Sequence, residues 1–553
     1  MIGANLLGSH CVPAAKACSQ RLIGRVVQTT TGRRGLANLA IFAAAKRLAQ
    51  SSEPDERNRV AIVDEAGAHT YADLLNDARK VRAALGNADH KGASIAMLMP
   101  NSYEYAAIQW GIWAAGGAVV PLSPMHPERE LEYFITNSES TKVICHPALL
   151  ENLRPVLDRL GSAVTVLGSD EIMGMPVATH AEQGPDPEIS EDQSALFIYT
   201  SGTTGKPKGV VHTHATIAAQ VSALYTAWGW TPSDRLLHML PLHHVHGIVV
   251  ALCSALWTGA TTEMLPKFDK NTVWNRIIDG PQDISILMGV PTMYARLLSA
   301  MEEMSPERQA AARASMGRLR LTISGSAALP ASVFRKWQQA TGQAMLERYG
   351  MSEIGMALSN DARTPAARKV GSVGKPLPMV QVRLTDAEGL DVTDTPGASG
   401  MIEVKGPNVF HEYYGMPEKT AKEFTSDGWF ITGDIGTRDS DGLYYIMGRQ
   451  SVDIIKSGGF KLSALEIERE LLEHPNVTDV AVVGIPDEEW GEVVAAAVVL
   501  KTGTVLDISD LKPWCHERMA RYKTPKMLKT VNALPRNLMG KLDKKAVKTL
   551  FTN

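Results

Sequence analysis

Hydroxyl groups, glycines and lysines gather in one short stretch, residues 199–209, with the sequence YTSGTTGKPKG. An apolar run at 195–198 precedes it and predicts a buried strand. Glycines let backbone N–H groups turn toward an anion, hydroxyls donate hydrogen bonds, and lysines supply positive charge. The spacing is not that of a Walker loop, because a proline follows the Gly-Lys pair. The stretch predicts a phosphate-binding loop, although a surface linker can have a similar composition.

A second stretch, LERYGMSE at 346–353, carries groups that suit a nucleotide and a metal ion. The ring of Tyr349 can stack on a purine. The carboxylate of Glu353 can bind Mg²⁺, a hard cation that prefers oxygen ligands. The small residues SGSA at 324–327 follow an apolar run, and small residues at the end of a strand allow a flat base to approach the backbone. These stretches together predict a nucleotide site.

Taken in their order along the chain, these motifs resemble those of the acyl-adenylate-forming enzymes, a family of acyl-CoA synthetases, luciferases and adenylation domains of peptide synthetases. The resemblance runs from about residue 60 to the C-terminus. It implies that ATP, a carboxylic acid and CoA are the substrates and that Mg²⁺ is the metal ion. The residues that it places around ATP are Thr200, Ser201, Gly202, Thr203, Thr204, Lys208, Ser324, Gly325, Tyr349, Gly350, Met351, Ser352, Asp434 and Arg449.

The resemblance also implies a reaction in two steps. A carboxylate attacks ATP and forms an acyl-adenylate with release of pyrophosphate, and a thiol then displaces AMP. Lys541, in the sequence PRNLMGKLDK at 535–544, matches the lysine that serves the first step, where its ammonium group offsets charge at the α-phosphate. The catalytic residues implied are Lys541, Glu353, Thr204 and His244, and Glu353 and Thr204 are the implied metal ligands.

The family's CoA loop approaches the thiol substrate after a rotation of the C-terminal domain. It matches four residues here: Ser457, Gly458, Gly459 and Lys461. One site cannot receive this loop and Lys541 together, so a moving domain is physically reasonable. The family often has a charged hinge residue at the position of Ser451, whereas the nearby acid in this chain is Asp453. The identity of the hinge residue therefore stays open.

The sequence PLHHVHG at 241–247 departs from many relatives, which have an aromatic residue at two of the histidine positions. In this respect the chain resembles malonyl-CoA synthetases, which share the histidine at 246 and use an arginine at position 296 for the distal carboxylate. Arginine suits a buried carboxylate because its planar fork donates two hydrogen bonds. The resemblance implies that the acyl substrate contacts Arg296, His246 and Ser324.

Other interpretations of the same residues remain open. Thr292, Arg296, Ser299 and Glu303 recur at helical spacing, which is also typical of a solvated helix face. The histidines can be packed side chains or metal ligands. The acid can be malonate, methylmalonate, or a short- or medium-chain monocarboxylate. A protein that senses nucleotide or acyl-CoA without catalysis is the alternative from a different functional class.

The composition is ordinary for a globular protein: the chain has 553 residues, of which 44% are hydrophobic and 21% charged, with a net charge of −3. Its length predicts more than one domain. The net charge argues against a nucleic-acid-binding protein. The sequence contains no uninterrupted apolar stretch of about 20 residues, so no transmembrane helix is predicted. The scattered cysteines predict reduced thiols, and the oligomeric state stays undetermined.

Apolar runs alternate with helical patterns from residue 60 onward, for example a helix at 71–85. This alternation predicts an α/β fold with parallel-rich sheets and flanking helices. Residues 34–449 are expected to form this large domain. Residues 450–553 are expected to form a small, mobile α+β domain that includes a helix at 511–521.

The N-terminal segment differs in composition from the rest of the chain. It is rich in arginine, serine, threonine and alanine, and the first acidic residue is Glu53. Such a composition is typical of a mitochondrial transit peptide, which we expect at residues 1–33. A soluble helix at 36–48 that belongs to the mature protein, in a cytoplasmic enzyme, is the alternative.

Overall fold

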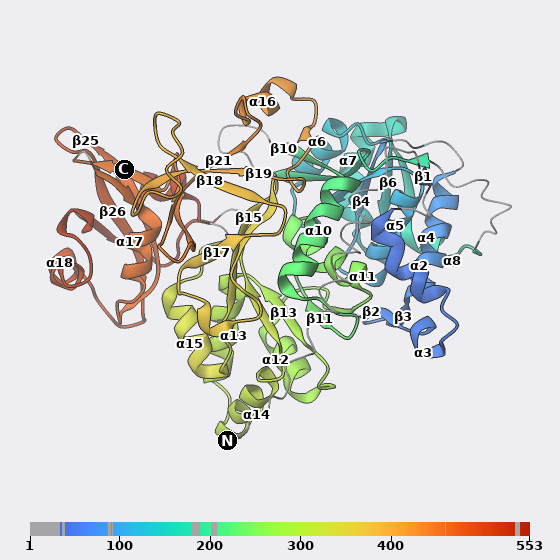
Figure 1. The fold of residues 1–553 in the computed structure, drawn as a ribbon, viewed down its shortest axis with the longest axis horizontal. Coiled ribbons are helices and arrows are strands. Elements are labelled where there is room, and N and C mark those ends of the chain that lie inside the picture. The colour runs from blue at the N-terminus through green and yellow to red at the C-terminus, as the bar shows by residue number, and fades with distance from the viewer. Residues whose placement is uncertain are drawn as a thin grey trace, which may run out of the picture.

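The computed structural model describes residues 34–35, 39–86, 90, 92–177, 188–200, 207–458, 460–536 and 542–552. Within these ranges the chain forms a large α/β unit and a smaller C-terminal α+β unit, coloured orange to red at one end of the molecule in Figure 1. This is the fold class that the sequence predicts. Outside the described residues lie several predicted site residues: 201–206, Gly459 and Lys541, and the side chain of Lys461.

One mixed sheet of 13 strands runs through the described part of the large unit. The strands from β15 to β2 are parallel, and the pairs on both flanks are antiparallel. The central parallel strands β13 and β14 are mostly apolar and buried along their whole length, because both of their faces are covered. In sheet order the strands are β18 (Gln381–Thr385), β19 (Ser399–Lys405), β21 (Phe430–Arg438), β22 (Tyr444–Arg449), β17 (Ser372–Pro376), β16 (Gly355–Ser359), β15 (Leu346–Met351), β14 (Leu321–Ser324), β13 (Ile286–Gly289), β11 (Arg235–His238), β12 (Thr261–Met264), β2 (Val60–Asp64) and β3 (Gly67–Thr70).

A second sheet of seven strands lies beside the first. Its strands from β9 to β7 are parallel, and β10 and β20 extend it in antiparallel pairing. In sheet order the strands are β20 (Glu412–Tyr413), β10 (Lys208–Thr213), β9 (Ser194–Thr200), β5 (Ala118–Leu122), β4 (Ser94–Leu98), β6 (Lys142–Cys145) and β7 (Thr165–Gly168).

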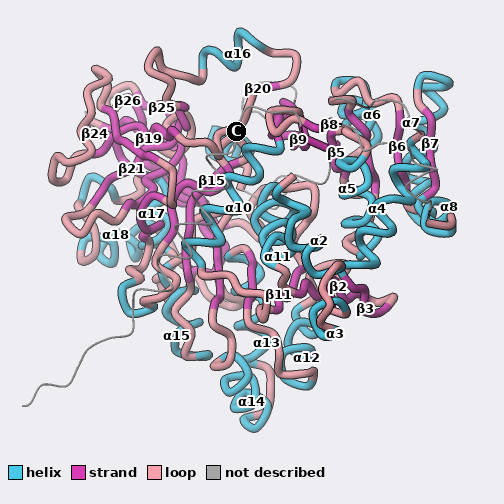
Figure 2. The backbone as a smooth tube through the Cα atoms, turned by 45° about the vertical axis from the view of Figure 1, so that its right-hand side comes forward, coloured by secondary structure: helices cyan, strands magenta, loops and turns pink. Residues whose placement is uncertain are grey.

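The helices of the large unit pack on and between these sheets (Figure 2). Helix α10 (His214–Trp228) contacts β10 of the second sheet and β16 of the first, so it lies between them and is apolar on most sides. Among the described helices, none combines the length and apolar composition needed to cross a membrane. The other main helices are α2 (Ala43–Ala49), α4 (Tyr71–Leu85), α5 (Tyr103–Ala114), α6 (Glu128–Asn137), α7 (Leu150–Leu160), α11 (Ser254–Thr258), α12 (Lys270–Asp279), α13 (Pro291–Glu302), α14 (Pro306–Met316), α15 (Ala331–Thr341) and α16 (Pro417–Lys422).

The C-terminal unit has its own five-stranded sheet and its own apolar core. The strands are β24 (Phe460–Ser463), β23 (Ile454–Ser457), β26 (Gly491–Leu500), β25 (Val477–Asp487) and β27 (Met527–Thr530), and the helices are α17 (Ala464–Leu471), α18 (Ile508–His516) and α19 (Lys544–Thr552). The helix expected at 511–521 is therefore shifted. It begins earlier because the side chain of Asp507 caps the N–H groups of Ser509 and Asp510.

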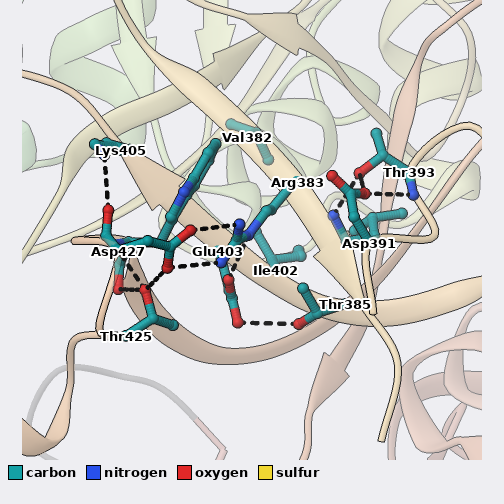
Figure 3. A network of polar contacts seen from close by, with 12 residues as sticks. Val382, Arg383, Thr385, Asp391, Thr393, Ile402, Glu403, Lys405, Thr425 and Asp427 are labelled. Carbon is teal, nitrogen blue, oxygen red and sulfur yellow. Dashed lines mark hydrogen bonds and ion pairs between the residues drawn. The ribbon is translucent and has the colours of Figure 1, made fainter. Parts of the chain in front are cut away.

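A polar network stiffens the edge of the large sheet where β18 and β19 pair (Figure 3). The guanidinium of Arg383 donates to Glu403 at 2.7 Å and to Asp427 at 2.9 Å, and it lies 4.4 Å from the centre of the Trp429 ring. Lys405 donates to the backbone carbonyl of Asp427 at 2.8 Å. These contacts fix the turn that precedes β21, the strand that carries Asp434.

The segment from Leu39 to Ala49 belongs to the core of the large unit. Phe42 packs edge-to-face on Trp110 at 4.8 Å, and Leu48 is fully buried. Helix α2 contacts α4 and α11. The helical pattern at 36–48 therefore reflects a folded element from Leu39 onward.

Candidate functional site

The predicted phosphate loop connects two neighbouring antiparallel strands. Thr200 ends β9 and is paired with Lys208 at the start of β10. Helix α6 holds both arms, because Tyr133 donates to the carbonyl of Pro207 at 2.9 Å and Tyr199 donates to Asn137 at 2.8 Å. The loop residues 201–206 themselves, including Thr204, lie outside the described residues.

Lys208 and Glu353 face a common region at the end of the loop. The ammonium group of Lys208 lies 4.2 Å from the centre of the Tyr413 ring, and burial lowers its pKa. The hydroxyl of the same tyrosine donates to Glu353 at 2.8 Å. Glu353 is 6% exposed, and burial raises the pKa of its carboxyl while Arg449 and Lys208 oppose that shift. Chain segments from β10, β20 and the β15–β16 turn therefore meet here.

The donor chemistry at Glu353 fits Mg²⁺ bound together with phosphates. No group of three or more histidine, cysteine, aspartate or glutamate side chains in the described ranges forms a metal cage. Mg²⁺ usually keeps several waters and binds one or two carboxylates plus substrate phosphates. A single buried carboxylate in the field of Lys208 and Arg449 meets that requirement.

Three strands bring together a tyrosine, an aspartate and an arginine. The hydroxyl of Tyr349 on β15 donates to Asp434 on β21 at 2.5 Å. Arg449 on β22 lies opposite Asp434 in the sheet register, and its Nε is 3.0 Å from the same carboxylate. Arg449 also donates to the carbonyl of Thr432 at 2.7 Å. An aromatic face, a carboxylate and a fixed cation thus form one wall, which suits a nucleoside.

The turn between β15 and β16 is tightly packed. A side chain at Gly350 would meet the carbonyl oxygen of Gly355 at 2.0 Å, so only glycine fits. Met351 ends β15, and the carbonyl of Ser352 accepts from Nε2 of His212 at 2.7 Å. Burial lowers the pKa of His212 to about 4, so this donor is a neutral imidazole. The turn that carries Glu353 is therefore held against β10.

Two of the three predicted acyl-pocket residues, His246 and Ser324, lie near a buried arginine that the motifs do not single out. Nδ1 of His246 lies 3.1 Å from the hydroxyl of Ser326, and the side chain of Ser324 is fully buried without a hydrogen-bond partner. The guanidinium of Arg348 lies against Gly325, where a side chain would meet its Cζ at 2.4 Å. Burial lowers the pKa of the His246 imidazole, and the nearby charge of Arg348 lowers it further.

Arg348 is 3% exposed, and its Nε and Nη2 have no hydrogen-bond partner. Burial lowers its pKa to about 9. The residue paired with Arg348 on the adjacent strand β16 is Ser359, which carries no charge. Only the structure reveals its burial, and a buried charge calls for an anionic partner.

Arg296 and His244 differ from Arg348 in their surroundings. Arg296 is exposed on α13, which fits the solvated-face interpretation of its spacing. The ring of His244 is half-buried and lies 4.2 Å from that of His243. His246 and Ser324 thus both lie near Arg348, whereas Arg296 is exposed on its helix.

The predicted CoA residues lie in the β23–β24 hairpin of the C-terminal unit. Ser457 is buried, and Gly458 has a φ of +55° with its N–H donating to the carbonyl of Trp490 at 2.9 Å. The ammonium group of Lys526 lies 3.4 Å from the centre of the Trp490 ring. Phe460 stacks on Tyr522 at 4.3 Å, and both rings are exposed. This exposed aromatic and basic surface was not predicted from the sequence, because its members are far apart in the chain.

Comparison with known proteins identifies the family. The model of the AMP-binding enzyme family matches residues 49–414, and the model of the AMP-binding enzyme C-terminal domain matches residues 466–541. The chain belongs to the AMP-binding enzyme family. The predicted resemblance is therefore confirmed, and the two matched regions correspond to the large and small units of the fold.

Named relatives in this family align along nearly the whole chain. The chain is 45% identical to the mitochondrial malonate–CoA ligase ACSF3 of Bos taurus, with 88% of this chain and 87% of the relative covered. It is 39% identical to the malonate–CoA ligase of Arabidopsis thaliana, with 87% and 82% covered. Among solved structures, ATP-bound MatB from Rhodopseudomonas palustris aligns with a TM-score of 0.82 and 36% identity, covering 93% of this chain and 99% of that one.

Proposed function

We propose that the protein is an ATP-dependent malonate–CoA ligase that converts malonate, ATP and CoA into malonyl-CoA, AMP and pyrophosphate. Family membership supports acyl-adenylate chemistry, and two relatives that align over most of the chain carry the name malonate–CoA ligase. The single observation in the fold that favours a dicarboxylic acid is the buried guanidinium of Arg348.

The argument for a dicarboxylate is electrostatic. A buried charge without a partner is unfavourable, and a carboxylate that enters the pocket relieves that cost. Arg348 has two unpaired N–H-bearing nitrogens beside His246 and Ser326, so a distal carboxylate would find charged and neutral donors together. A monocarboxylic acid would leave the guanidinium unpaired. Arg296, which the resemblance implies for this task, is the competing candidate.

In this proposal the nucleotide is held by the large unit. The loop 201–206 and Lys208 bind the phosphates, Tyr349 packs on the base, and Asp434 accepts from the ribose hydroxyls. Glu353, together with Thr204, would hold Mg²⁺, and the ion would neutralise phosphate charge. Lys541 approaches the α-phosphate for the first step, where a cation stabilises the charge that develops.

CoA is the proposed thiol acceptor, and the C-terminal unit delivers it. Gly458 and Gly459 let the backbone pass close to the pantetheine, and Lys461 lies next to them in the sequence. The exposed rings of Phe460, Tyr522 and Trp490 and the charge of Lys526 offer a stacking surface and a cation for the nucleotide part of CoA. The boundary near residue 450 and a hinge at Ser451 or Asp453 remain part of this proposal.

Mitochondrial targeting is proposed for residues 1–33. Their acid-free, arginine-rich composition supports it, as does the word mitochondrial in the name of the Bos taurus relative. Expression with a C-terminal fluorescent tag tests it: co-localisation with a mitochondrial marker is expected, and a cytoplasmic signal contradicts it.

A pyrophosphate-release assay tests the function. Purified protein is mixed with ATP, Mg²⁺ and CoA and with one acid at a time: malonate, methylmalonate, acetate, propionate or hexanoate. We expect the highest kcat/KM with malonate and weaker turnover of methylmalonate, because an added methyl group is only modestly rejected. Higher kcat/KM with a monocarboxylate would support a short- or medium-chain acyl-CoA synthetase instead. No turnover with any acid would favour a nucleotide sensor.

A further inference from the structure

Lys544 is a buried lysine at the start of α19. Its ammonium group forms an ion pair with Glu468 of α17 and donates to the carbonyl of Val482 at 2.7 Å. It also lies 3.4 Å from Oδ1 of Asp453. Glu468 and Val482 belong to the body of the C-terminal unit, whereas Asp453 lies in the segment that enters this unit from β22. Lys544 therefore connects α19 to Asp453, at the start of the C-terminal unit.

Asp453 uses its other carboxylate oxygen in the opposite direction. Oδ2 accepts from the backbone N–H of Arg449 at 3.0 Å. Gly448 makes this approach possible, because a side chain there would meet Cβ of Asp453 at 2.5 Å, and its φ is +127°. Arg449 in turn is fixed by Asp434. One carboxylate thus joins the last strand of the large unit to the lysine on α19.

The same end of α19 closes the segment that contains Lys541. Residues 537–541 lie outside the described residues, but Arg536 and Leu542 on either side form an antiparallel bridge. The N–H of Asp543 donates to the carbonyl of Pro535 at 3.0 Å, and its side chain accepts from the N–H of Lys545 at 3.1 Å. Both arms of the segment therefore meet next to Lys544.

We propose that Asp453 and Lys544 are positioning residues that tie the base of the Lys541 segment to the hinge strand at Arg449. This inference rests on the function proposed above. Asp434 holds the side chain of Arg449, and the backbone N–H of Arg449 donates to the Asp453 carboxylate. The same carboxylate lies next to Lys544, which follows Lys541 by three positions. Because only the first half-reaction needs Lys541, loss of the tie slows adenylation and spares thioester formation.

The experiment compares two half-reactions in full-length variants. Asp453→Asn keeps the size of the side chain but removes its charge, and Asp453→Glu keeps the charge. Lys548→Ala is the matched control, because Lys548 lies one turn further along α19 and approaches Glu492 at 3.8 Å instead. Malonate-dependent exchange of labelled pyrophosphate into ATP reports adenylation, and the reaction of preformed malonyl-adenylate with CoA reports the second step.

We expect Asp453→Asn to slow the exchange about 10-fold or more, the effect of losing a charge-assisted contact, and to change the second step less than about threefold. Asp453→Glu should recover most of the exchange, and Lys548→Ala should match the wild type. Equal losses in both steps, with or without a lower melting temperature, would overturn the inference, as would an unchanged exchange rate. If the wild type shows no malonate-dependent exchange, the proposed function fails, and the acid that does support exchange is used for the same comparison.

Discussion

Glu347 and Arg348 follow each other on β15 and face opposite sides of the sheet, as successive residues of a strand do. Glu347 accepts from the N–H of Leu329 at 2.9 Å and lies in the field of Arg469 from α17. Burial raises its pKa to about 7, whereas burial lowers the pKa of Arg348 to about 9. Each side chain is therefore held in an environment that disfavours its charged form.

Replacement of Arg348 should separate activity from stability. Arg348→Met removes a buried charge, so the empty protein should melt at the same or a higher temperature, while kcat/KM for malonate should fall about 100-fold or more because the distal carboxylate loses its partner. The KM for ATP should change less than about twofold. Arg296→Met is the control on an exposed arginine. If Arg296→Met abolishes malonate turnover and Arg348→Met does not, the assignment of the distal carboxylate is reversed.

The raised pKa of Glu347 predicts a pH-dependent stability. A carboxyl whose pKa is higher in the folded than in the unfolded state stabilises the fold at low pH, and this contribution is lost as the pH rises from about 4.5 to about 7. Glu347→Gln should therefore raise the free energy of unfolding by about 3 kcal/mol at pH 8 but only by about 1 kcal/mol at pH 5. Thermal melts of both proteins at the two pH values measure this. An equal gain at both would contradict it.

Sequence motifs identify residues that chemistry singles out, and they miss residues whose role depends on surroundings. Tyr349, Asp434 and Arg449 were predicted from motifs, and the structure brings them into contact. Arg348 lies within a predicted motif, yet only its burial and its unpaired nitrogens distinguish it. Burial of a single side chain follows from tertiary packing, which local periodicity does not contain.

At the scale of elements, the β23–β24 hairpin depends on a tryptophan from the neighbouring turn. A side chain at Gly458 would meet the Trp490 ring at 2.8 Å, so the glycine allows the ring to pack closely against the backbone of the hairpin. The ammonium group of Lys526, just before β27, lies 3.4 Å from the centre of the same ring. Hairpin, ring and lysine thus form one surface.

Loss of this surface should affect the use of CoA alone. Lys526→Ala should raise the KM for CoA about 5- to 20-fold, which corresponds to a contact of about 1–2 kcal/mol, and leave malonate-dependent pyrophosphate exchange unchanged. Lys529→Ala, at a basic residue on the adjoining strand that donates to the carbonyl of Leu550, is the control. A change in the exchange rate, or an unchanged KM for CoA, would rule out this role.

Elements with clear end signals were predicted well. The helix expected at 71–85 has those bounds in the structure, because Thr70 and Asp73 form a capping box that is readable in the sequence. The helix expected at 511–521 instead spans Ile508–His516, because the side chain of Asp507 caps its first turn. The pairing of β21 with β22 in the large sheet could not be predicted from such local end signals, because it depends on tertiary contacts.

For the whole molecule, the core extends close to the N-terminus. Phe42 is 1% exposed and Leu48 is 0% exposed, and both pack in the largest apolar cluster among the described residues. The predicted targeting segment ends before this point. The boundary between a removable segment and the folded enzyme should therefore fall between residues 33 and 39.

Two truncations test that boundary. Removal of residues 1–33 should change the melting temperature by less than about 2 °C, whereas removal of residues 1–49 should cost more than about 5 kcal/mol, since it deletes several buried side chains. Circular dichroism melts and solubility measure both. A large loss with the shorter truncation would show that residues 1–33 belong to the folded protein.

The pairing of Asp434 with Arg449 has a consequence for turnover. Both belong to the same hydrogen-bonded sheet as Tyr349, so a twist of the chain beyond Arg449 leaves all three in place. An acyl-adenylate bound through its ribose would then stay in the site while the C-terminal unit rotates and presents a different face. The mixed anhydride would never need to enter bulk water, where hydrolysis would waste one ATP for each molecule lost.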